Sequence, residues 1–201
     1  MAKTDQKIYQ FKITLEEIRP SIWRRIQVPE TYTFWDFHVA ITDAMGWLDY
    51  HLHQFDISNP KTGEKEEIGI PHEEYENNTL AGWKIPIASY FSMENKKANY
   101  LYDFGDSWRH KILLEKILPR ELASQYPICI AGERACPPED CGGVGGYENL
   151  LEIIKDKKHE EYKRKMKGLG GNYNPEEFVL QDVHFYNPKE RWIRAFQDPT
   201  L

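Results

Sequence analysis

The sequence contains few cysteines and no long hydrophobic run. Cys129, Cys136 and Cys141 are an odd number of thiols, so no disulfide framework is required and a reducing compartment is favoured. The chain starts without a signal-peptide pattern, and its apolar runs are far shorter than the roughly 20 residues of a membrane span. We therefore expect a soluble cytoplasmic protein with no membrane partner.

An excess of positive charge is also missing. The 201 residues include 26 Lys and Arg against 32 Asp and Glu, which gives a net charge of −6 and a pI near 5.7. Such a surface does not attract nucleic acid as a whole, although a local basic patch can still do so. A hydrophobic content of 40% supports a sizeable core. No internal repeat or linker divides the chain, so we expect one domain over residues 1–201.

What the chain does contain is a mixture of strand and helix patterns. Thr33, with Asp36 three residues later, predicts the start of a helix that Gly46 ends. Other segments show strand-like patterns at residues 8–15, 21–28 and 179–185, and helical periodicity at residues 147–154 and 188–196. These patterns predict an α+β fold, with a mostly antiparallel sheet, one long packing helix and C-terminal helices.

Residues 99–115 predict a central β-hairpin with Gly105-Asp106 as a two-residue turn. In that register Asp103 pairs with Trp108 and lies diagonal to His110, within reach of a hydrogen bond. The tyrosines of the first strand then lie on the opposite, half-solvated face. The favoured interpretation is an Asp-His-Trp network that fixes the hairpin, and an acid/base pair is the alternative.

A histidine pair offers one candidate metal site. His51 and His53 lie two residues apart in a strand-like segment, so both imidazoles can reach one zinc ion. His110, Asp103 or Asp106 would complete the site. The alternative is that these histidines make hydrogen bonds in a polar core or line a cleft.

The cysteines offer a second candidate zinc site. Cys136 and Cys141 are separated by four residues, and Cys129 would be a third ligand. A rigid proline-rich turn with small buried thiols explains the same residues. The glycine-rich stretch 142–146 has no P-loop lysine or hydroxyl, and a loop that needs positive φ is favoured over an anion cradle.

A basic run suggests a local nucleic-acid contact. Residues 155–167 contain seven Lys and Arg against three Asp and Glu. A solvated helix face with ion pairs is the simpler explanation of this run. The candidate contact residues are Arg24, Arg25, Lys163, Arg164 and Lys165.

Four segments together, in the same order, carry a family resemblance. They are IRPSIWRRIQVP, TFWDFHVAITDAMGWLDYHLHQF, YLYDFGDSWRH and CIAGERACPPEDCGGVGGYENLLEII. They resemble the plasmid pRiA-type ORF-3-like family, some of whose members are labelled as passenger proteins of insertion elements. The resemblance implies an α+β fold and an association with plasmids or mobile elements. It implies little about activity, because the family is functionally uncharacterised.

Three functions follow as hypotheses. The first is a binding or adaptor module, and the second is a metal-dependent hydrolase that uses His51, His53, Asp103 and His110. The third is an accessory nucleic-acid-binding protein. No cofactor is required by the sequence, and zinc is the candidate metal. The expected cleft is lined by Trp47, His51, His53, Asp103, Asp106, Trp108 and His110.

Overall fold

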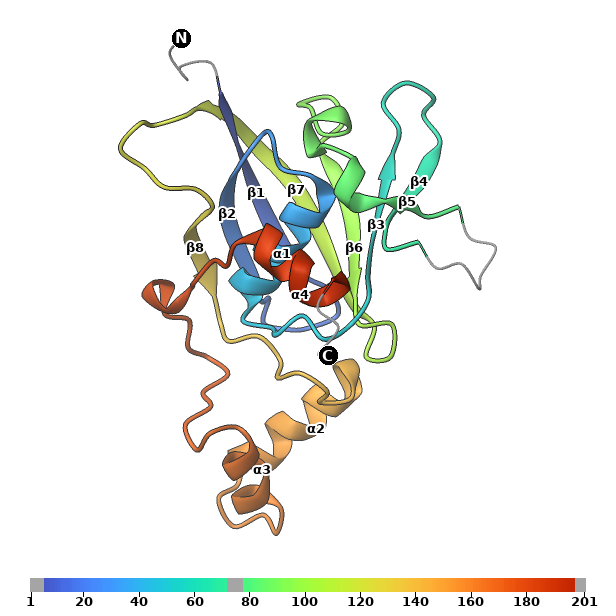
Figure 1. Cartoon of the computed structure of the whole chain (residues 1–201). Helices are drawn as coiled ribbons and strands as arrows, with labels where there is room; N and C mark the ends of the chain where they lie inside the picture. Colours follow the sequence, from blue (N-terminus) through green and yellow to red (C-terminus); the bar gives the residue numbers. More distant parts are fainter. Residues whose placement is uncertain (1–5, 72–77, 198–201) are drawn as a thin grey trace.

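The computed structural model describes residues 6–71 and 78–197, and its centre is a twisted sheet (Figure 1). The described residues form an eight-stranded sheet in the order β5-β4-β3-β6-β7-β1-β2-β8. All neighbouring strands are antiparallel except β4 and β5, which are parallel. The strands are β1 (Lys7–Leu15), β2 (Trp23–Pro29), β3 (His53–Ser58), β4 (Lys65–Gly69), β5 (Leu80–Ala81), β6 (Lys97–Tyr102), β7 (Trp108–Pro119) and β8 (Ile128–Glu133).

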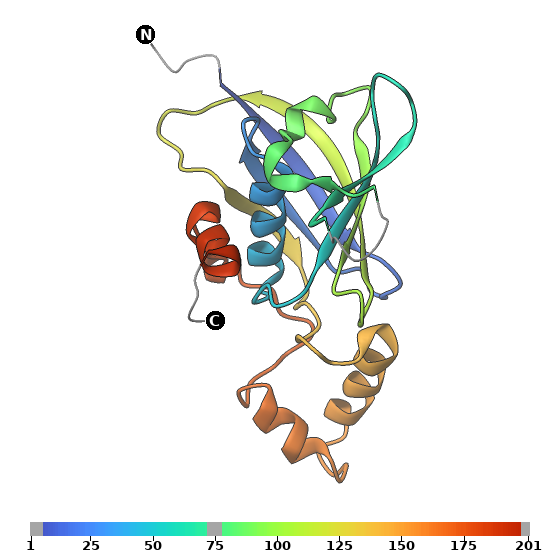
Figure 2. The ribbon, with the colours of Figure 1, turned by 45° about the vertical axis from the view of Figure 1, so that its right-hand side comes forward.

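Four α-helices accompany the sheet in the described part of the chain, which confirms the predicted α+β class. They are α1 (Phe34–Met45), α2 (Gly143–Lys155), α3 (Tyr162–Gly168) and α4 (Pro188–Phe196). Helix α1 lies across one face of the sheet with α4 beside it, whereas α2 and α3 lie beyond the end that carries the β6–β7 turn (Figures 1 and 2). None of the described helices is long and apolar enough to cross a membrane.

Helix α1 has the ends that the sequence predicts. The Thr33 side chain accepts a hydrogen bond from the Asp36 amide, and the Asp36 carboxylate accepts one from the Thr33 amide. At the other end Gly46 takes a left-handed conformation with φ of 89°. The apolar face of α1 then packs on alternate side chains of the strands, including Phe11 and Phe55. The sheet and α1 therefore enclose one core.

The β6–β7 hairpin differs from its predicted register by one residue. Tyr102 pairs with Trp108 and Tyr100 with His110, so the turn has five residues rather than two. The cause is Asp103, whose φ is 57° and whose Oδ1 accepts hydrogen bonds from the amides that follow it. Because a shift of one residue exchanges the two faces of a strand, the tyrosines lie in the core instead of on a half-solvated face.

Two further segments also differ from their predicted structure. Residues 179–185 contain a 3₁₀ turn, Leu180–Asp182, in place of the expected strand. Strand β8 lies in the irregular cysteine-containing segment and adds an edge strand to β2. Both outcomes depend on neighbours in space, because short segments carry too little periodicity to specify a strand alone.

Candidate metal centre

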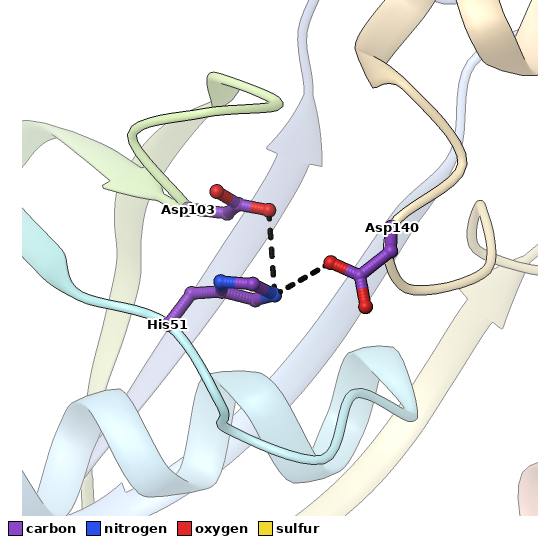
Figure 3. A group of neighbouring side chains, drawn as sticks. All are labelled: His51, Asp103 and Asp140. Carbon is purple, nitrogen blue, oxygen red and sulfur yellow. Dashed lines mark ion pairs between the residues drawn. The ribbon is translucent and has the colours of Figure 1, made fainter.

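Three loops meet at the end of the sheet and bring acidic side chains around one histidine. His51 belongs to the segment between α1 and β3, Asp103 to the β6–β7 turn, and Asp140 to the loop before α2 (Figure 3). The Nε2 atom of His51 lies 2.9 Å from Oδ1 of Asp140 and 3.5 Å from Oδ2 of Asp103. Oε2 of Glu139 lies 3.9 Å from the same nitrogen. One imidazole nitrogen therefore faces three carboxylates.

In Asp103 and Glu139, one carboxylate oxygen accepts hydrogen bonds from neighbouring groups and the other oxygen is directed at His51. Oδ1 of Asp103 accepts from the Gly105 amide at 2.8 Å, which leaves Oδ2 for the imidazole. Oε1 of Glu139 accepts from the Leu48 amide at 2.7 Å and from the Tyr102 hydroxyl at 3.0 Å. Such outer hydrogen bonds orient ligand groups in metal sites.

Tyr102 is a fixed donor in this arrangement. Burial raises the pKa of its hydroxyl far above the usual range, and the neighbouring Glu139 charge and hydrogen bond raise it further. The phenol therefore keeps its proton and continues to donate to Glu139. Its oxygen also accepts from the Tyr50 amide at 3.2 Å, so Tyr102 links the loop after α1 to the loop before α2.

Two atoms at the centre lack ordinary partners. Although Asp140 is close, the buried Nε2 of His51 has no hydrogen bond of acceptable geometry among the described residues. The buried Oε2 of Glu139 likewise has none. Unsatisfied buried polar atoms are uncommon in proteins and each calls for an explanation, such as a bound ion.

Glycines allow the loop before α2 to approach the β6–β7 turn. Gly142 and Gly143 have φ of 95° and 65°, and a Cβ on Gly143 would lie 2.6 Å from the Asp106 carbonyl oxygen. The Gly142 amide donates to the Asp106 carboxylate at 3.0 Å. The positive φ expected for this loop is therefore confirmed at these two glycines.

The expected three-histidine site needs a correction, because the structure does not bring its members together. His53 stacks on His38 with ring centroids 3.4 Å apart, inside the core. His110 is also buried, beside the rings of Trp47 and Tyr100, and neither of its nitrogens has a hydrogen-bond partner in the described part of the chain. The register shift places Tyr100 opposite His110 and leaves Asp103 in the turn, so His110 cannot meet Asp103 as expected.

The expected cleft needs the same correction. Trp47 and Trp108 are 3% and 0% exposed, and with His53 and His110 they belong to the packed interior. Asp106 lies on the surface turn and accepts from the Gly142 amide. Of the seven residues expected to line a cleft, His51 and Asp103 form the candidate centre.

The three cysteines do not form a zinc cluster. Among the described residues, His51, Asp103 and Asp140 are the one group of three ligand side chains whose donor atoms lie within 4.8 Å of one another. Cys136 lies 3.2 Å from the Met45 sulfur, and Cys129 lies near the Ala131 carbonyl. Burial raises the pKa of all three thiols, to about 12 for Cys141, which opposes the thiolate form needed for zinc binding or nucleophilic attack.

The adjacent arginines are not available to nucleic acid in the way expected. Arg24 is 2% exposed and donates to the Ala44 and Glu133 carbonyl oxygens. Arg25 forms an ion pair with Glu115 at 2.6 Å. The two side chains point to opposite faces of the sheet, and each finds partners on its own face. The other three basic candidates, Lys163, Arg164 and Lys165, lie on α3.

The comparison with known proteins agrees with the sequence motifs. A family model for the plasmid pRiA4b ORF-3-like protein matches residues 7–182. The chain belongs to this family. The uncharacterized protein y4hQ of Sinorhizobium fredii (strain NBRC 101917 / NGR234) is 30% identical to this chain over 166 residues, which are 82% of each protein.

A solved structure is similar to this ORF-3-like chain. The crystal structure of a protein of unknown function, MM3350 from Methanosarcina mazei Go1, has 50% sequence identity and a TM-score of 0.84. The match covers 90% of this chain and 100% of the other. The fold is therefore shared with the Methanosarcina mazei protein, and neither name specifies a ligand or a reaction.

Sequence reasoning missed two acidic residues of the candidate centre. Glu139 and Asp140 stand in the CPPEDCGG motif, between the prolines and the second cysteine of the predicted proline-rich turn. They come from a loop about 90 residues away from His51, as the positions in the chain show. The signal that could have found them is the adjacent pair of carboxylates in this motif.

Proposed function

We propose that this chain binds one divalent metal ion, Zn²⁺ or Mn²⁺, through His51, Asp103 and Asp140. The observation that carries the proposal is their convergence, because one ligand atom from each lies within 4.8 Å of the others. Ligands of a tetrahedral ion with bonds of about 2.1 Å are separated by about 3.4 Å, which is close to the observed separations. Glu139 stands next to this set.

The charge balance supports the same conclusion. Three carboxylates surround one imidazole, so the cluster is negative even when His51 carries a proton. A divalent ion would offset this charge and use the unpartnered Nε2 atom as a ligand. Imidazole nitrogen favours zinc, and carboxylate oxygen favours manganese and magnesium, so a mixed set suits Zn²⁺ or Mn²⁺ best.

Metal titration of the untagged, chelator-treated protein tests the proposal. We expect about one equivalent of Zn²⁺ or Mn²⁺ to bind, and the His51→Ala and Asp140→Asn variants to bind it at least about tenfold more weakly. Asp140 is largely exposed, so its amide variant removes the negative charge of a ligand with little risk to folding. Isothermal titration calorimetry and elemental analysis give affinity and stoichiometry.

His184→Ala is the matched control, because His184 is an exposed histidine far along the chain from the centre. It should bind the ion as the unmodified protein does. The proposal is overturned if the protein binds no metal, or if His51→Ala retains the full affinity while its circular dichroism spectrum is unchanged.

A hydrolytic function is the second candidate, and Glu139 favours it. A bound metal ion supplies a water of lowered pKa as a nucleophile. Oε2 of Glu139 is buried, unpartnered and 3.9 Å from His51, a position from which a carboxylate can accept a proton from such a water. Its other oxygen is held by Tyr102 and Leu48, so the side chain is oriented for this role.

The hydrolytic function predicts a separation between metal affinity and activity. With the metal-loaded protein and p-nitrophenyl phosphate, we expect Glu139→Gln to lower the rate of p-nitrophenol release at least about 100-fold. Metal affinity should change much less, because the amide oxygen can still accept from Tyr102 and Leu48. If the metal binds and no hydrolysis is detected in the unmodified protein, the centre serves to order the three loops for binding rather than for catalysis.

A further inference from the structure

A pocket beside the candidate metal centre is lined by two of the basic residues of α3. The pocket has a volume of about 370 Å³ and is bounded by α2, α3 and the loop before α2. Arg164 and Lys165 lie on one side, and Glu139 lies on the side of the candidate centre. This volume is in the range of pockets that hold small molecules.

The walls of this pocket, which we call the α2–α3 pocket, differ in character. Pro138, Leu150 and Leu169 supply apolar surface, and Arg164 and Lys165 supply positive charge. Arg164 pairs with Glu161 in the preceding turn, while Lys165 has no ion pair among the described residues. The α2–α3 pocket therefore combines an apolar wall with two cations and the carboxylate of Glu139.

Glu139 joins the pocket to the candidate centre. It lines the pocket, and its Oε2 atom lies 3.9 Å from Nε2 of His51. Its position is fixed by the hydrogen bonds from Tyr102 and Leu48. A ligand in the α2–α3 pocket would therefore lie next to the metal centre rather than at a separate surface.

We propose that the α2–α3 pocket binds a small phosphate monoester that carries an apolar group. A phosphate dianion matches two cations and a neighbouring metal ion, and an aryl or alkyl group matches the wall formed by Pro138, Leu150 and Leu169. The role of the metal ion in this proposal rests on the proposed function. The charge and shape of the pocket are independent of it.

This assignment gives the basic run of α3 a different partner from the one expected. Lys163, Arg164 and Lys165 were candidates for nucleic-acid contact. Arg164 and Lys165 line a pocket of limited volume, whereas Lys163 does not line it. A pocket of that size accepts a single small molecule.

Binding of p-nitrophenyl phosphate tests the inference. We expect the full chain to bind this probe, as measured by saturation-transfer difference NMR and calorimetry, with and without Zn²⁺. The Arg164→Glu, Lys165→Glu double variant should bind at least tenfold more weakly. The Lys163→Glu variant makes half of this charge change, on the same helix but outside the pocket, and we expect less than a twofold effect.

The two proposals fail separately. Zn²⁺ affinity measured on the same samples should be unchanged in all three proteins, because none of the substituted residues is a proposed ligand. Failure of the unmodified chain to bind the probe overturns the pocket assignment whatever the metal result. Equal loss in Lys163→Glu and in the double variant also overturns it, because that result shows a general charge effect. Probe binding without metal binding supports the pocket and overturns the metal centre alone.

Discussion

Replacement of Gly146 by alanine is expected to destabilise the protein by about 3 kcal/mol, in the upper range for inserting a group into a packed site. A Cβ at this position would lie 1.9 Å from the carbonyl oxygen of Cys141. That oxygen belongs to the backbone, so the loop before α2 must move to accept the methyl group. Because Asp140 precedes Cys141 directly, the same movement should weaken metal binding. Urea denaturation followed by tryptophan fluorescence, together with Zn²⁺ titration, measures both effects.

Gly145→Ala is the matched control one residue away. A Cβ on Gly145 meets nothing within 4 Å, and Gly145 lies inside α2. Alanine in a helix is favoured over glycine by roughly 0.5–1 kcal/mol, so this variant should be as stable as the unmodified protein or more stable. Equal urea midpoints for Gly145→Ala and Gly146→Ala would contradict the close approach of Cys141 to α2.

Acid is expected to destabilise the protein through His110. Burial lowers the pKa of this histidine to about 4, whereas an unfolded chain has a histidine pKa near 6.5. Below pH 6.5 His110 is therefore protonated in the unfolded state, whereas in the folded state it stays neutral down to about pH 4. The free energy of unfolding should fall by about 2 kcal/mol between pH 7 and pH 5 from this residue, and the loss stops near the folded pKa.

His110→Phe removes the titrating group while it keeps a planar ring beside Trp47 and Tyr100. The change in packing alters the free energy of unfolding by the same amount at every pH. The informative quantity is therefore the slope of this free energy against pH. We expect a shallower slope between pH 7 and pH 5 than in the unmodified protein. His184→Ala, which removes an exposed histidine, should leave the slope unchanged. Identical slopes in His110→Phe and the unmodified protein would show that another group controls acid stability.

Local patterns predicted elements whose signals lie within a few residues. Thr33, Asp36 and Gly46 mark the ends of α1 by hydrogen bonds inside one turn of helix, and the structure has both ends where they predict. The segment 188–196 became α4 for similar reasons, with Asn187 as its N-cap. These interactions need no distant partner, so the sequence was sufficient.

The β6–β7 hairpin shows where local reasoning fails. Gly105-Asp106 satisfies the rules for a two-residue turn, yet the Asp103 carboxylate accepts amide hydrogen bonds that favour a five-residue turn. The same residues are compatible with either turn. The five-residue turn is the one that buries Tyr100 and Tyr102 in the core. One residue of register then determined whether Asp103 or the two tyrosines shared the face of His110.

The sequence by itself determined the fold class, the ends of α1, the family and the candidate residues His51 and Asp103. Only the tertiary structure decided which side chains accompany them. His53 and His110 are close to these residues in sequence but belong to the core, and Glu139 and Asp140 are distant in sequence but meet His51. The physical reason is that a ligand set is defined by directions and distances between loops. Those depend on the packing of α2 against the β6–β7 turn, which no local periodicity encodes.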